Sequence, residues 1–201
     1  MKNVRPVLIA LALVMAGCAD TSSDQAVVEQ TSGGWSWSSL APWNWFGHSI
    51  EISESGVGTI NRATPMTTDA IQQALGGDYT LRKGMRSEKG QVIAFFQAMK
   101  DNRVMIEISG GKYVSQVIVM DSAITTDQGA KIDLPFSKLY EEAFGSCVKN
   151  NERNLDGVLC QAMDSHHISY LFNGKWNGPE SIMPPDDILQ NWTISKLIWK
   201  N

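Results

Sequence analysis

The stretch DYTLRKGMRSEKGQVIAFFQAMKDNRVMIEISGGKYVSQVIVM, residues 78–120, decides the fold. It contains four apolar-rich runs that are separated by short turn sequences. The pairs Asp101-Asn102 and Gly110-Gly111 suit the positive φ angles of two-residue hairpin turns. The run at 91–99 is apolar on both faces, which predicts a central strand that is covered on both sides. The whole stretch therefore predicts an antiparallel meander.

Two helical patterns flank the meander. Thr64-Pro65 is typical of an N-cap followed by proline at the first helical position, and Gly76-Gly77 is expected to end that helix. PFSKLYEEAFG, residues 135–145, has the strongest helical pattern in the chain, because its apolar residues form one stripe that ends at Gly145. The stripe is expected to pack against the core and consists of Phe136, Leu139, Tyr140, Ala143 and Phe144.

Strand patterns occupy most of the remaining sequence. We expect strands at 49–53, 157–163, 166–172 and 192–200, with a short helix that begins at Asp186-Asp187. An antiparallel meander sheet with two or three short helices makes the fold mainly β, either α+β or a sandwich. We expect a single globular domain over residues 48–201.

The composition excludes several classes of protein. The chain has 201 residues, with 17 Lys and Arg against 21 Asp and Glu, for a net charge of −4. A nucleic-acid binder needs clustered cations, so nucleic acid is not an expected partner. No repeat of solenoid or propeller length is visible in the sequence.

The first residues, MKNVRPVLIALALVMAGC, have the pattern of a secretory signal. Lys2 and Arg5 precede an apolar run at 7–16 that is too short to span a bilayer of about 30 Å. The run ends in Met15-Ala16-Gly17-Cys18, which resembles a bacterial lipobox, although leucine is more usual than Met15. We expect residues 1–17 to be a lipoprotein signal peptide and Cys18 to carry the lipid, including palmitate. Ordinary signal cleavage with an incidental cysteine is the alternative.

A polar tether and a tryptophan-rich segment follow Cys18. Residues 18–34 lack apolar periodicity and are expected to form a flexible tether. Residues 35–47 hold four of the seven tryptophans: Trp35, Trp37, Trp43 and Trp45. Three interpretations stay open: the indoles clip the tether to the domain, lie at the membrane–water interface, or form a partner-binding patch.

Two cysteines remain once Cys18 carries lipid, and they allow one pairing, Cys147 with Cys160. A disulfide is expected because the bacterial periplasm is oxidising, and it would pin the end of the 136–144 helix to the following strand. The alternative is a metal site with His166 or His167, which is disfavoured because adjacent residues on a strand point to opposite faces. No metal or cofactor is expected.

The sequence contains no recognisable catalytic set. It lacks a nucleophile elbow, a zinc-protease helix motif, a P-loop and a dinucleotide fingerprint. Asp164, Ser165 and His166 have the residue types of a triad, but consecutive residues cannot converge as nucleophile, base and orienter. We therefore expect a protein that is not an enzyme.

Several blocks resemble the enterobacterial RpoE-regulated lipoprotein family of the YfeY type. They are APWNWFG, GDYTLRKGM, PFSKLYEEAFGSC, HHISY and WNGPESIMPPDDILQNWTISKLIW. The resemblance implies a domain of unknown function under envelope-stress control, with a mainly β fold. It also implies an outer-membrane location, with lipid on Cys18 and no catalytic residues to transfer. Because Ala19 rather than aspartate follows Cys18, the lipoprotein sorting pattern points to the outer membrane and its periplasmic face.

The functional hypothesis is a non-enzymatic binding module that acts in envelope homeostasis. The membrane is contacted through the lipid anchor, and the partner is an envelope protein of unknown identity. The alternative is a hydrolase or carrier for cell-wall or lipid material, with a pocket near His166, His167 and the loop at 178–187. A third option is a structural coat protein that is made under stress.

The tryptophan segment gives the first testable prediction. We expect Trp43, Trp45 and Phe46 to dock on the domain core, and Trp35 and Trp37 to stay mobile. In the lipid-free protein, a soluble quencher should therefore reduce the emission of Trp43 and Trp45 less than that of Trp35 and Trp37. Equal quenching of all four indoles would contradict this division.

Overall fold

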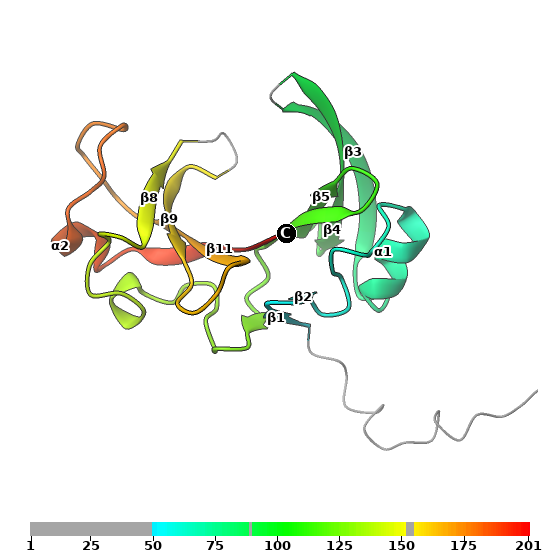
Figure 1. The fold of residues 1–201 in the computed structure, drawn as a ribbon, viewed down its shortest axis with the longest axis horizontal. Coiled ribbons are helices and arrows are strands. Elements are labelled where there is room, and N and C mark those ends of the chain that lie inside the picture. The colour runs from blue at the N-terminus through cyan, green and yellow to red at the C-terminus, as the bar shows by residue number, and fades with distance from the viewer. Residues whose placement is uncertain (1–49, 89, 152–154) are drawn as a thin grey trace, which may run out of the picture. The chain divides into compact units, whose positions relative to one another are not determined.

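An eight-stranded antiparallel sheet dominates the structure, a computed structural model that describes residues 50–88, 90–151 and 155–201 (Figure 1). The strand order is β3-β4-β5-β6-β11-β10-β9-β8. The strands are β3 (Thr80–Glu88), β4 (Gln91–Lys100), β5 (Arg103–Gly110), β6 (Val114–Val119), β8 (Cys147–Asn150), β9 (Gly157–Gln161), β10 (Ile168–Asn173) and β11 (Thr193–Lys200). All described residues belong to one compact unit of the chain. The mainly β, α+β prediction is confirmed.

The remaining elements are short. β1 (Glu51–Ser53) pairs antiparallel with β2 (Gly56–Val57) and parallel with β7 (Thr125–Thr126), which makes a second, three-stranded sheet. The helices are α1 (Thr68–Ala74) and α2 (Asp186–Leu189), with a 3₁₀ turn, η3 (Phe136–Lys138). The predicted start of α2 at Asp186 is confirmed, and both carboxylates lie in its first turn.

The main core lies on one face of the eight-stranded sheet. Alternate residues of paired strands share this face, as in the cross-strand series Phe96↔Ile108↔Val117↔Trp199. Ile52 and Val57 of the small sheet and Ile71 of α1 are buried in the same cluster. The small sheet and α1 therefore cover this face.

The second face of the sheet carries a smaller apolar cluster and a polar network. Ile118, Leu171 and Ile198 are buried there with Leu155. Arg86 and Gln97 both contact Glu107, and Arg82 contacts Gln97. Burial lowers the pKa of Lys196 on this face, and the negative charge of Glu107 opposes that shift.

The meander is confirmed, with two corrections. Asp101 and Asn102 have positive φ angles of 50° and 61°, as the turn prediction required. Gly110 and Gly111 do not, so that part of the prediction was wrong. Glycine is needed at 110 because a Cβ there would lie 2.1 Å from the Tyr113 carbonyl oxygen. β4 is flanked by β3 and β5 but not covered on both sides, since Val92 is 73% exposed.

The first helix begins later than the sequence indicated. Its N-cap is Thr67, whose hydroxyl accepts the Ala70 N–H at 3.4 Å, and not Thr64. Residues 64–66 instead pair with the β5–β6 connection, where Val114 N–H donates to Thr64 O and Met66 N–H donates to Lys112 O. The predicted end is correct, because Gly76 and Gly77 both adopt positive φ.

The helix predicted at 135–145 does not form beyond the η3 turn. Phe136 N–H donates to Trp192 O at 2.8 Å, so the backbone at the start of this segment pairs beside β11. Phe136 and Tyr140 pack on Phe172 with ring centroids 5.2 and 5.9 Å away, but Phe144 is 89% exposed. Backbone pairing at Phe136, and a hydrogen bond from Ala143 N–H to the Asp186 side chain, therefore override the helical pattern.

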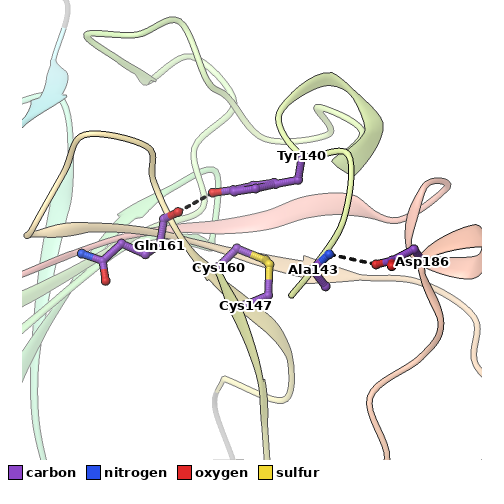
Figure 2. The surroundings of a disulfide bond; sticks show 6 residues. All are labelled: Tyr140, Ala143, Cys147, Cys160, Gln161 and Asp186. Carbon is purple, nitrogen blue, oxygen red and sulfur yellow. Dashed lines mark hydrogen bonds between the residues drawn. A yellow bond between two sulfur atoms is a disulfide. The ribbon is translucent and has the colours of Figure 1, made fainter. Parts of the chain in front are cut away.

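The predicted disulfide is present, but it joins different elements from those expected (Figure 2). Cys147 lies at the start of β8, directly opposite Cys160 on β9, with a Cα–Cα distance of 4.0 Å. It therefore links two neighbouring antiparallel strands and does not join a helix end to a strand. Beside it, Tyr140 Oη donates to Gln161 O at 2.6 Å and Ala143 N–H donates to Asp186 Oδ1 at 2.8 Å (Figure 2).

Removal of this disulfide should destabilise the domain measurably. The crosslink closes a loop with a sequence separation of 13, for which the chain-entropy estimate is about 3 kcal/mol. Urea unfolding of a Cys147→Ala, Cys160→Ala variant should show a loss of that order. Under reducing conditions, the wild-type protein should lose a similar amount. A loss well below about 1 kcal/mol would contradict the estimate.

Candidate functional site

The structure tests only some of the predicted site residues. Cys18 and the tryptophans at 35, 37, 43 and 45 lie outside the described residues. The lipid site and the three interpretations of the tryptophan segment therefore stay predictions. Cys147 and Cys160 are joined in the disulfide. The remaining candidates are the histidines that follow β9.

Ser165 organises the turn between β9 and β10. Its side chain is buried, and its hydroxyl oxygen accepts the backbone N–H of His167 at 3.2 Å and of Ile168 at 2.8 Å. Since Ser165 is committed to this turn, the structure supports rejection of the triad with Asp164 and His166.

Glu54, which follows β1, anchors this turn to the small sheet. Its Oε1 accepts the His166 backbone N–H at 3.0 Å. The hydrogen bond from Ser165 is the largest cause that lowers the Glu54 pKa. The N–H groups of His166 and His167 and the charge of His167 lower it further, whereas partial burial opposes them. Glu54 is therefore held as a carboxylate.

His167 and Trp199 join this cluster to the last strand. His167 Nδ1 lies 2.7 Å from Lys200 O, and because a carbonyl only accepts, Nδ1 carries a proton. Its Nε2 lies 4.0 Å from Glu54 Oε2. Trp199 is buried, and its Nε1–H donates to Glu54 O at 3.2 Å. The centroids of the His167 and Trp199 rings are 6.2 Å apart, and the two rings together form a wall of a hollow.

An open hollow of about 480 Å³ lies against this wall. Its lining comes from both ends of the described chain and consists of Glu54, Ser55, Asn61, Arg62, Ala63, His167, Trp199 and Asn201. We call it the Glu54 hollow.

Arg62 contributes a positive charge to the lining of the Glu54 hollow. It lies in a turn that Asn61 holds, since Asn61 Oδ1 accepts the Ala63 N–H at 2.9 Å and Asn61 O accepts the Thr64 N–H at 3.0 Å. Arg62 is exposed, and no carboxylate among the described residues forms a salt bridge with it. A guanidinium of this kind suits a carboxylate or phosphate on a bound partner.

The acid–base groups at the Glu54 hollow take part in hydrogen bonds that hold the fold. Glu54, Ser165 and His167, which could act as acid, nucleophile and base, each hold a fixed structural hydrogen bond. In the described part of the chain, no cluster of three or more His, Cys, Asp or Glu side chains could hold a metal ion. Arg62 and Asn201 therefore remain as groups for hydrogen bonding to a ligand.

The pocket required by the hydrolase or carrier alternative is only partly present. His167 lines the Glu54 hollow, but His166 and the loop at 178–187 do not. That loop is used in packing, since Asp186 accepts the Ala143 N–H and Trp176 Nε1–H donates to Pro179 O at 3.2 Å. The Glu54 hollow therefore does not bring this loop together with the two histidines.

Sequence reasoning missed Glu54, Arg62, Trp199 and Asn201. No local motif marks them, because Glu54 and Trp199 are 145 positions apart and meet only in the folded chain.

Within the described residues, no helix is long and apolar enough to cross a membrane.

Comparisons with known proteins identify relatives whose function is unknown. A family model described as "Protein of unknown function (DUF1131)" matches residues 34–201. The "Uncharacterized protein YfeY" of Escherichia coli (strain K12) is 45% identical over 201 residues and is covered completely, as is this chain. The crystal structure of the uncharacterized protein yfeY from Escherichia coli has a TM-score of 0.70 at 46% identity, covering 75% of this chain and 99% of that chain.

The Glu54 carboxylate should make stability depend on pH. Because its folded-state pKa is lowered, its contribution is present above the ordinary carboxyl pKa and is lost as the pH falls through the folded value. A Glu54→Gln variant should be less stable than wild type at neutral pH, and the gap should close under acidic conditions. Glu51→Gln, an exposed change in β1, is the matched control for urea unfolding. A gap that is independent of pH would contradict the assignment.

Proposed function

The chain belongs to the DUF1131 family of proteins of unknown function, and we propose that it is an outer-membrane-anchored periplasmic lipoprotein that binds an envelope protein without catalysing a reaction. Lipid on Cys18 anchors it, residues 18–34 tether the domain, and its synthesis responds to envelope stress through RpoE. The signal-like leader and the lipobox support the anchor. The Glu54 hollow supports the binding role.

One observation carries the binding role. The Glu54 hollow has an exposed guanidinium, Arg62, beside potential catalytic groups that already hold the fold together. An exposed arginine in a preformed hollow can bind a carboxylate through two parallel hydrogen bonds. The proposed partner therefore presents an acidic side chain to Arg62, with the Asn201 amide as a further donor.

The hollow is also preorganised, which favours binding. Asn61 holds the turn at Arg62, and the hydrogen bond from Trp199 to the Glu54 backbone holds another part of the lining. Groups that are already ordered lose less conformational freedom when a partner binds. A discrete protein partner is therefore more consistent with this site than general adsorption.

Photo-crosslinking in cells under envelope stress tests the binding role. A crosslinker at Ala63, on the hollow, should give a discrete protein adduct. A crosslinker at Ala123 should not, and it is a matched control because both alanines are exposed and follow a side-chain-capped turn. Arg62→Ala should reduce the Ala63 adduct by about tenfold or more, as expected for a binding hot spot.

Two results would contradict the binding role. One is the absence of an adduct from Ala63, and the other is an adduct that persists unchanged in Arg62→Ala. Because Arg62 is exposed, its replacement should leave the free energy of unfolding within about 0.5 kcal/mol. A loss of adduct would then report binding and not unfolding.

The anchor is tested separately. Cys18→Ser should abolish metabolic labelling with palmitate and release the protein from the outer-membrane fraction. Labelling that survives this substitution would contradict lipidation at Cys18. The crosslinking result does not depend on this outcome, so the two parts of the proposal can fail independently.

A further inference from the structure

The β3–β4 hairpin projects beyond the rest of the eight-stranded sheet (Figure 1). β3 and β4 stay paired as far as Glu88↔Gln91, whereas the last β4–β5 pair is Ala94↔Gly110. Its tip therefore has no third strand beside it. We call residues 83–87 and 90–95, together with Lys112 and Tyr113, the finger.

Large apolar side chains are exposed on the finger. Met85 is 74% exposed and Val92 is 73% exposed. The pairs Met85↔Ala94 and Ser87↔Val92 place them on the same face of the hairpin. Tyr113, in the connection beside Gly110, is 45% exposed. An exposed apolar cluster on a projecting element is typical of an interaction site.

Two lysines, Lys83 and Lys112, belong to the finger. Lys83 lies on the same hairpin face as Met85, with its Nζ 5.8 Å from the Phe96 ring centroid. Lys112 Nζ lies 5.4 Å from the Tyr113 ring centroid. Lys112 is therefore held beside an exposed aromatic ring, and Lys83 shares the hairpin face that carries Met85 and Val92.

The segment that contains the finger, residues 79–120, has a net charge opposite in sign to that of the rest of the chain. Residues 79–120 contain seven Lys and Arg and three Asp and Glu, a net charge of +4. The remaining residues contain ten Lys and Arg and eighteen Asp and Glu, a net charge of −8. Although the chain as a whole should be repelled by an anionic surface, this end should be attracted to one.

We propose that the finger binds the surface of a bilayer that contains anionic phospholipids. Lys83 and Lys112 contact lipid phosphates, and Met85, Val92 and Tyr113 enter the interfacial layer. Aromatic and apolar side chains flanked by cations are favoured at that depth. A symmetric contact with the finger of a second copy is disfavoured, because it would bring two regions of charge +4 together.

This contact extends the proposed function. The Glu54 hollow plays no part in it, since none of the lining residues belongs to the finger. Weak binding by the finger would also become effective beside a lipid anchor, because the tether keeps the effective concentration high. Its test does not require the anchor, so the two proposals can fail separately.

Vesicle co-sedimentation of the non-lipidated chain from Ala19 to Asn201 tests the proposal. This chain should bind vesicles of phosphatidylethanolamine with phosphatidylglycerol, and binding should weaken as salt is raised. It should bind vesicles of phosphatidylcholine alone much less. Met85→Ser with Val92→Ser should reduce binding, and Lys83→Gln with Lys112→Gln should reduce it about fivefold per cation.

The controls use residues of similar exposure elsewhere. Phe144→Ser with Met163→Ser removes two exposed apolar side chains outside the finger, and Lys138→Gln removes an exposed cation. These variants should bind like wild type. Circular dichroism should show the same fold in every variant, because all the replaced side chains are exposed.

Four results would overturn the proposal. They are no binding to anionic vesicles, equal binding to both kinds of vesicle, undiminished binding by the finger variants, and equal loss in the controls. Light scattering tests a second copy as the occupant. A dimer in the lipid-free sample that Met85→Ser with Val92→Ser dissolves would assign the finger to self-association and also overturn the proposal.

Discussion

The insertion of the last strand into the middle of the large sheet is the constraint on which the structure depends. β11 pairs with β6 through Leu197↔Val119 and Trp199↔Val117, and with β10 through Tyr170↔Leu197. In the described sheet, β11 is the strand that joins the β3–β6 meander to the β8–β10 strands. Two locally formed groups of strands therefore become one sheet only when the C-terminal strand is in place.

The same strand builds the Glu54 hollow. Trp199 donates to the backbone after β1, Lys200 O holds the His167 ring, and Asn201 N–H donates to Ser115 O at 2.9 Å. The hollow therefore forms when β11 joins the two groups of strands into one sheet, and it does not arise from any local motif. Trp199 and His167 hold β11 beside the segment that follows β1, through the Trp199 hydrogen bond to Glu54 O and the His167 contact with Lys200 O.

The sequence predicts what neighbouring residues determine and misses what distant residues impose. The β3–β6 meander was predicted because each hairpin turn lies between its own strands, as at Asp101-Asn102. The 135–145 helix was wrong because Phe136 pairs with a backbone more than fifty positions away, at Trp192. The Cys147–Cys160 pairing followed from counting cysteines, but its place between β8 and β9 did not. Arg62 and Trp199 gave no signal, because the hollow joins segments from the two ends of the domain.

Native-state hydrogen exchange tests most directly whether β11 makes the sheet one cooperative unit. The amides of residues 197–199 should exchange with the same free energy as those in the centres of β5 and β10, because loss of β11 separates the sheet into two parts. Global unfolding should then be the route by which all of them exchange. If β11 exchanged through a cheaper opening while β5 and β10 stayed protected, the two groups of strands would be stable without it, and this account would be contradicted.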